Sequence, residues 1–219
     1  MSIGELLTLY GDNYLAAIGQ TLSMTAVAFV FAMGIAIVVT VMRVSPIKPL
    51  RIVGDLYVQI FRNIPGVSLL IIVAYALPNL NIVLPWKTCV MVAVVLLASG
   101  FGSENFMSGI NTIGVGQIEA ARSIGLTFGQ TMSKVVIPQA LRSAVLPMTN
   151  LLIATLLTTA LGSQVPLSPQ ELTGLVSYIN TRSVGGILPF VISATVYAGT
   201  SVLLGMLGNA IDKKVRILR

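Results

Sequence analysis

The segment Tyr14-LAAIGQTLSMTAVAFVFAMGIAIVVTV-Met42 is the first clear indication of the fold class of this 219-residue chain. It carries no charged side chain, and it exceeds the roughly 20 apolar residues that a helix needs to cross a hydrocarbon core about 30 Å thick. Small residues such as Ala28, Ala32 and Gly34 suit close packing of helices in lipid. The sequence therefore predicts a transmembrane helix over residues 14–42.

The composition of the whole chain extends this prediction. Hydrophobic residues make up 55% of it and charged residues 9%, against roughly 25% charged in an ordinary soluble domain, and the mean hydropathy is +0.93. We therefore expect an all-α integral membrane protein. Further spans are predicted over residues of about 56–77, 86–107, 144–161 and 187–211. Pro65 should start or kink the helix of the second span, and a polar, turn-rich stretch separates the last two.

The positions of the basic residues predict the orientation, because Lys and Arg collect in cytoplasmic segments. Eleven of the thirteen basic residues fall on one side of the predicted spans, and only Lys87 and Arg182 fall on the other. Residues 1–13 then form an extracytoplasmic N-terminal segment without a cleavable signal, and residues 213–219 form a basic cytoplasmic tail held at membrane lipid. This distribution also argues against nucleic-acid binding.

The chain offers little for catalysis. It has no histidine and one cysteine, Cys89, and no two of its seven acidic residues have a spacing typical of a metal site or an acid and base pair. A phosphate-binding P-loop is also absent from the sequence. We expect no catalytic residue, no metal site and no cofactor bound by this chain.

One cytoplasmic stretch, residues 114–138, is too polar for a span and too regular for a linker. It predicts two short helices with a turn at Gly125, since glycine permits a sharp turn. Thr127 is placed to cap the second helix, and Pro138 should limit it. The stretch is either a surface loop that covers the end of the bundle or a helix that docks a soluble partner.

The pattern Glu119-Ala120-Ala121, Gly125, Val135 and Ile137-Pro138 resembles the EAA loop of permease subunits in binding-protein-dependent ABC importers. The surrounding sequence is similar to the polar amino acid uptake subfamily, the HisMQ-like permeases. Three further segments carry this similarity, and the last two of them are most like glutamate-type permeases: Phe61-Arg-Asn-Ile-Pro65, Met42-Arg-Val-Ser-Pro46 and Ser108-Gly-Ile-Asn-Thr112.

The resemblance implies a five-helix, MetI-like transmembrane domain of a type I importer over residues 14–212, in the cell membrane, with the EAA loop at 114–140. Two permease subunits would form the pathway, an ABC ATPase dimer would bind beneath them, and an extracytoplasmic substrate-binding protein would deliver the amino acid. The coupling helix with Glu119, Ala120, Ala121 and Gly125 would sit in a groove of the ATPase. ATP and Mg would be bound by that partner, so this chain would not itself be an enzyme.

Two departures from the family pattern affect the predicted site. The Arg that often follows Glu104 by one turn is absent, so Glu104 either pairs with Arg62 or extends to cytoplasmic water. A Lys common in the fourth span of relatives is replaced by Leu157, which favours a heterodimer in which another permease subunit contacts an anionic substrate.

The sequence leaves undetermined which residues line the pathway, and it allows two alternative functions. Asn150, Thr158 and Thr159 are candidates to line the pathway, although a threonine in a membrane helix commonly bonds to its own preceding turn. The first alternative function is a structural half-subunit that contributes little to substrate binding. The second is a secondary transporter that works without ATP, which would be expected to carry charged relays and inverted repeats within its spans.

Overall fold

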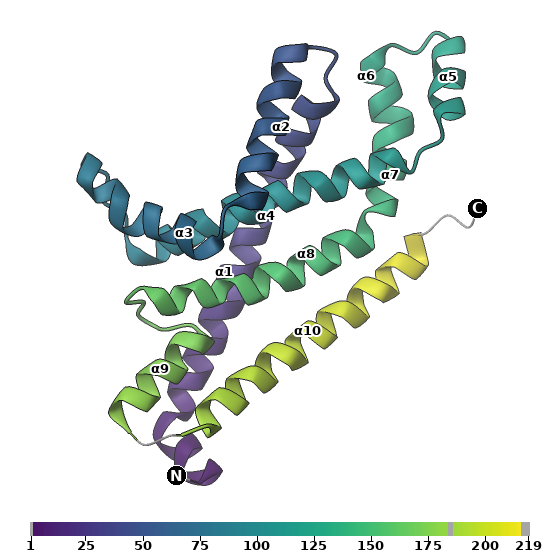
Figure 1. Cartoon of the computed structure of the whole chain (residues 1–219). Coiled ribbons are helices and arrows are strands. Elements are labelled where there is room, and N and C mark those ends of the chain that lie inside the picture. The colour runs from purple at the N-terminus through teal and green to yellow at the C-terminus, as the bar shows by residue number, and fades with distance from the viewer. Residues whose placement is uncertain (1, 184–185, 216–219) are drawn as a thin grey trace.

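The computed structural model describes residues 2–183 and 186–215, and within those ranges every regular element is a helix. Figure 1 shows long helices that cross one another, with a short helical hairpin projecting at one end beside α2. The elements are α1 (Ile3–Val44), α2 (Lys48–Asn63), α3 (Gly66–Ile71), η1 (Ile72–Ala76), η2 (Leu77–Leu80), α4 (Trp86–Asn111), α5 (Val115–Ser123), α6 (Phe128–Thr131), η3 (Met132–Val136), α7 (Ile137–Ser143), α8 (Val145–Thr158), η4 (Thr159–Gln164), α9 (Leu172–Arg182) and α10 (Leu188–Val215).

The first helix is longer than the predicted span. It begins at Ile3 because Ser2 and Glu5 form a capping box, in which each side chain accepts a hydrogen bond from the other residue's backbone N–H. Residues 3–13, expected as a separate segment outside the membrane, are therefore the first turns of α1. The helix ends at Val44, two residues before Pro46.

The predicted kink at Pro65 is confirmed, and it is sharp. Ile64 has an extended backbone and Pro65 precedes the first residue of α3, so the helix cannot continue through this point. The axes of Lys48–Asn63 and Gly66–Leu80 differ by 103°. The region expected as a span over 56–77 is thus a bent pair of helices that begins earlier, at Lys48.

Four helical segments in the described residues are long and apolar enough to cross a membrane alone. They are α1, α4, the continuous α8 and η4 (Val145–Gln164), and α10. The bent pair of α2 and the helices after Pro65 passes the same test of length and hydropathy as one unit. The fold therefore supplies four membrane-length helices, or five with the bent pair.

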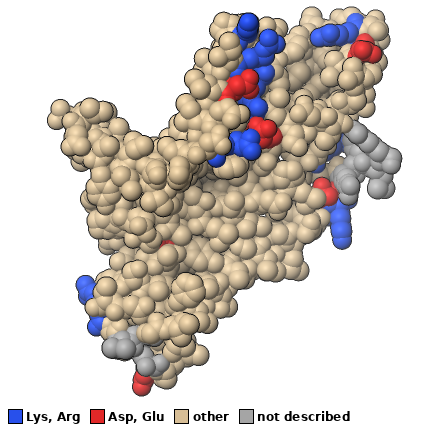
Figure 2. Space-filling model, in the orientation of Figure 1, with Lys and Arg blue, Asp and Glu red and all other residues tan. Residues whose placement is uncertain are grey.

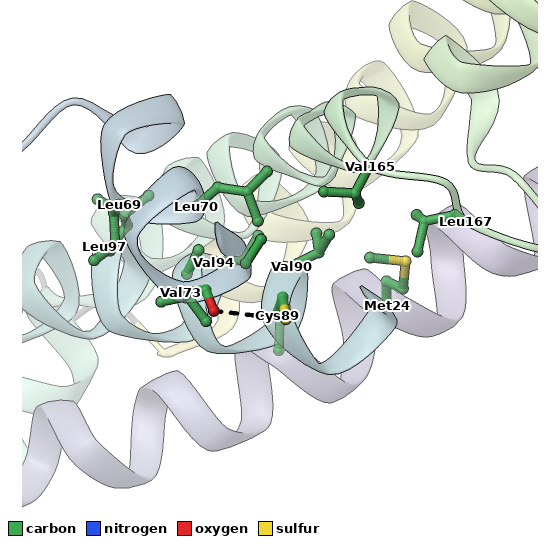
Figure 3. Close-up of a cluster of buried hydrophobic side chains, with 13 residues drawn as sticks. Met24, Leu69, Leu70, Val73, Cys89, Val90, Val94, Leu97, Val165 and Leu167 are labelled. Atoms are coloured by element: carbon green, nitrogen blue, oxygen red, sulfur yellow. Dashed lines mark hydrogen bonds between the residues drawn. The ribbon is translucent and has the colours of Figure 1, made fainter. Parts of the chain in front are cut away.

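A buried apolar cluster holds α1, α3, η1 and α4 together, and Figure 3 shows its side chains directed toward one another. Met24 of α1, Leu70 of α3 and Val90 of α4 are each fully buried in it. Val165 and Leu167, which follow η4, close the cluster from another side. Cys89 is also buried here, with its thiol 3.9 Å from the carbonyl of Val73, so it acts as a small apolar residue in the core.

The polar, turn-rich stretch between the last two predicted spans contains the helix α9, for which the sequence predicted no helix. Glu171 caps α9, since its carboxylate accepts hydrogen bonds from the backbone N–H groups of Thr173 (2.7 Å) and Gly174 (2.5 Å). Tyr197 of α10 donates a third (3.0 Å). Glu171 is fully buried, and burial raises the pKa of its carboxyl, partly offset by these hydrogen bonds.

Lys and Arg on the surface are gathered in a few places. Figure 2 shows Lys and Arg gathered over α2 and around α5 and α6, with a broad uncharged surface over α3, α8 and the middle of α10. An uncharged band of this kind is suited to contact with lipid. Arg216 and Arg219 of the predicted basic tail lie outside the described residues.

Candidate functional site

The helical hairpin of residues 115–143, here the α5–α7 hairpin, is closed by a turn at Gly125. Gly125 has a φ of +84°, which is unfavourable for residues with a Cβ. Its N–H donates to the carbonyl of Arg122 (2.9 Å), and the N–H of Leu126 donates to the carbonyl of Ala121 (3.1 Å). These two bonds make a Schellman motif, so the predicted turn at Gly125 is confirmed.

The second arm of the hairpin starts as predicted but does not end as predicted. Thr127 caps α6 in a capping box with Gln130. Pro138, however, does not limit the helix, because α6, η3 and α7 run on without interruption. A π-turn makes this possible, because the N–H of Ile137 donates to the carbonyl of Met132, five residues back instead of four. This shift in the backbone hydrogen bonds accommodates the missing N–H of proline.

The hairpin presents one face of α5 to solvent. Ala121 is buried and Ile118 is half-buried against an apolar cluster of Ile113, Val136 and Ala140. Glu119 and Ala120, by contrast, are exposed, as is Gly125. The outer face of α5 therefore carries one carboxylate on a backbone that small residues leave open to close approach.

A close backbone contact joins this hairpin to the membrane helices. Gly109 of α4 lies against Ala140 of α7, so that a Cβ added to Gly109 would be 2.7 Å from the Ala140 carbonyl oxygen. A real Cβ does not approach a carbonyl oxygen so closely, and a backbone atom cannot rotate away as a side chain can. Gly109 thus permits a direct mechanical contact between α4 and the hairpin.

An open pocket of about 960 Å³ lies between α4, α8 and the region of the break at Pro65. Asn150 and Thr158 line it, while Thr159 is fully buried and is not part of its wall. The hydroxyl of Thr158 donates to the carbonyl of Ala154 (2.7 Å), as expected for threonine in a membrane helix. Among the described lining residues, Arg62 is the one charged group.

Arg62 belongs to an ion-pair cluster, here the Arg43 cluster, made of Arg43, Asp55, Arg62 and Glu104. Arg43 is at its centre, with contacts of 2.8 Å to Asp55 and 3.0 Å to Glu104. Arg62 lies 3.5 Å from Glu104, so the structure does bring the expected pair together. The nearer partner of Glu104 is Arg43, a pair that no local sequence pattern indicated. The cluster ties α1, α2 and α4 to one another.

The sequence matches a known family over most of its length. Residues 32–217 match the family described as "Binding-protein-dependent transport system inner membrane component". The chain belongs to this family. It is thus a permease component of a transport system in the membrane, as the EAA pattern predicted.

Curated relatives of this permease extend over nearly the same length. The glutamate transport system permease protein GluC of Corynebacterium glutamicum is 31% identical over 215 residues, covering 93% of this chain and 92% of the relative. The L-cystine transport system permease protein TcyB of Bacillus subtilis is 30% identical over 196 residues, covering 89% and 83%. The permease therefore falls among amino acid permeases of ABC importers.

A solved structure shows the same fold. The crystal structure of an amino acid ABC transporter with histidines matches 98% of this permease and 100% of its own chain, with a TM-score of 0.90 and 24% sequence identity. The expectation of an all-α membrane domain of the type I importer fold is thereby confirmed.

Proposed function

We propose that this permease is one transmembrane subunit of an ATP-driven importer for a polar amino acid, with glutamate or a similar acidic or amide amino acid as substrate. Its similarity to a glutamate permease supports this choice, and its similarity to a cystine permease sets the wider class of polar amino acids. The pocket fits such a substrate, since Arg62 offers a cation to a carboxylate and Asn150 offers an amide.

The orientation that we propose places the N-terminus outside and the C-terminus in the cytoplasm. The gathering of Lys and Arg over α2 and the α5–α7 hairpin supports a cytoplasmic position for that end of the molecule. An extracytoplasmic binding protein would then deliver substrate at the end that carries α9.

The helix α5 is exposed on a firmly held hairpin, and this observation supports the proposed coupling to an ATPase. The inner face of α5 is fixed by Ala121 and its end is fixed by the Schellman turn at Gly125. We expect Glu119 and Ala120 to enter a groove of an ABC ATPase. That ATPase subunit would bind ATP and Mg. Closure of the ATPase dimer on ATP would press on α5, and the contact of Gly109 with α7 would pass the displacement to α4.

A second, different permease subunit completes the pathway in this proposal. Leu157 lines the pocket and is 49% exposed, at the position where relatives of the predicted subfamily carry a Lys. An apolar side chain there cannot pair with a substrate carboxylate. The partner subunit would supply the missing charge opposite Arg62.

Substitution of Gly125 tests the coupling. Gly125→Ala should strain the left-handed backbone by about 1–2 kcal/mol, tilt α5 and lower both ATPase co-purification and ATP-driven uptake in proteoliposomes. Gly129→Ala is a matched control, since Gly129 lies in the helix α6 and an added Cβ would meet nothing within 4 Å. Unchanged ATPase yield and uptake in Gly125→Ala would refute the coupling role.

Two further measurements test the assembly and the energy source. Full uptake by this permease and the ATPase, expressed without any other permease, would contradict the heterodimer. Uptake driven by an ion gradient in the absence of ATP would instead support a secondary transporter, and with it the whole proposal would fail.

A further inference from the structure

A second groove, of about 700 Å³, lies between α1 and α4. Met91 and Val95 line it, whereas Leu97 and Phe101 of the same helix line the transport pocket. Because each residue of an α-helix is turned by about 100° from the last, these two pairs point to different sides of α4. The groove is therefore separate from the proposed pathway.

The groove is polar at one end only. Ser23 of α1 and Lys87 and Thr88 of α4 lie at this end, and Lys87 is the second residue of α4, next to Trp86. Tryptophan and lysine are typical of the membrane interface. The lining residues that follow along α1 are apolar and include Val27, Phe31 and Ile35.

The length of the groove matches one leaflet of a bilayer. From Ser23 to Ile35 a helix rises about 18 Å, and half of a hydrocarbon core is about 15 Å. Met24 at the polar end belongs to the buried cluster of Figure 3, so the floor of the groove is formed by the protein core. An extended acyl chain would fill the space between the polar end and Ile35.

The cation at the polar end has hydrogen-bonding capacity to spare. The ammonium group of Lys87 donates to the side-chain oxygen of the buried Gln20 (3.1 Å), which holds it over the end of the groove. One of its three N–H groups is used in this bond, and the others suit the oxygens of a phosphodiester. Ser23 is held in the same place, because its hydroxyl donates to the backbone carbonyl of Gln20 (2.9 Å).

We propose that this groove binds an anionic phospholipid, with the phosphodiester at Lys87 and one acyl chain along Val27, Phe31 and Ile35. The apolar wall accepts any acyl chain, so selectivity comes from the charge of the headgroup. The site holds α1 against the start of α4 from the lipid side. It is a structural lipid site, independent of the amino acid that the importer carries.

Lipid titration of the purified full-length protein tests the headgroup contact. Native mass spectrometry with phosphatidylglycerol and phosphatidylcholine of equal chain length should show preferred retention of phosphatidylglycerol. Lys87→Gln should reduce this preference about fivefold, the ratio given by about 1 kcal/mol per cation at an anionic surface, and Lys87→Arg should keep it. Arg182→Gln is the matched control, because Arg182 stacks on Tyr178 and is not part of the groove. Equal effects of the Lys87 and Arg182 substitutions would overturn the proposal.

Filling the groove tests the acyl chain. Val27→Trp should lower retention of both lipids, whereas Val30→Trp, at an exposed position of α1 outside the groove, should not. Equal retention in these two variants would overturn the proposal. If Val27→Trp instead prevents association with another permease subunit and Val30→Trp does not, the groove is a subunit interface and the lipid assignment is wrong.

Discussion

Replacing Glu171 with alanine should destabilise the permease by about 3 kcal/mol. The carboxylate caps α9 by accepting from two backbone N–H groups, so the cost of losing the cap is the cost of leaving these two donors without an acceptor. The N–H groups of Thr173 and Gly174 would then lie in a buried region without their acceptor, and a buried unsatisfied polar group costs about 1–3 kcal/mol. Tyr197 keeps a contact with the Thr173 hydroxyl at 3.4 Å, so its hydroxyl adds little to the loss.

Thermal unfolding of the detergent-solubilised protein measures this effect. For a chain of this length a loss of 3 kcal/mol corresponds to a Tm lower by about 6–12 °C. Glu171→Gln should cost about 1 kcal/mol or less, because the amide oxygen can still accept a hydrogen bond from the start of α9. Glu5→Gln serves as the control, since Glu5 also accepts a capping hydrogen bond but is exposed.

The pH dependence gives an independent test of the same residue. Burial raises the pKa of Glu171 above its ordinary value of 4.5, so the folded state keeps this proton to higher pH than the unfolded chain does. The contribution of Glu171 to stability therefore falls as pH rises above about 4.5. The Tm of Glu171→Gln should fall less than that of the wild type between pH 4.5 and 7. A Tm loss below about 2 °C in Glu171→Ala, or a wild-type pH slope in Glu171→Gln, would show that Glu171 is not the stabilising cap described here.

Two other substitutions test contacts at the opposite end of the molecule. Gly109→Ala should displace α7, because the new Cβ would lie against the Ala140 carbonyl. We expect the free energy of unfolding to fall by about 1–3 kcal/mol and the stimulation of ATPase activity by substrate to weaken. Unchanged stimulation would contradict the transmission through this contact. Arg43→Gln should lower the Tm more than Arg62→Gln does, since Arg43 contacts Glu104 at 3.0 Å and Arg62 contacts it at 3.5 Å. Equal decreases in Tm would show that Arg43 is not the centre of its cluster.

Features that depend on adjacent residues could be predicted from the sequence. The turn at Gly125 and the cap at Thr127 each need only a few neighbouring residues, and so does the break at Pro65. Pro138 shows the limit of such rules. Proline normally ends a helix, but a single π-turn before Pro138 lets the helix continue past it. No sequence signal predicts that π-turn.

Contacts between distant parts of the chain could not be predicted in the same way. Glu104 lies 61 residues from Arg43, and the sequence predicted Arg62 or water as its partner because nothing in the local pattern pointed to Arg43. A local signal for α9 does exist, because Leu172, Leu175 and Ile179 follow a helical period and are all buried. The many polar residues around these three made the helical period hard to recognise, so the capping role of Glu171 was not predicted either.

The continuity of α1 has a consequence for how the two ends of the permease communicate. In its N-terminal half, Tyr14 donates to the carbonyl of Pro189 and Thr21 accepts from the N–H of Leu172, while Arg43 holds the ion-pair cluster at the other end. A helix of 42 residues without interruption is about 63 Å long, about twice the hydrocarbon core. A tilt of only about 5° would move one end by about 5 Å relative to the other. In the proposed assembly, α1 would act as a lever that passes a small rotation from the ATPase-binding end to its contact with α9.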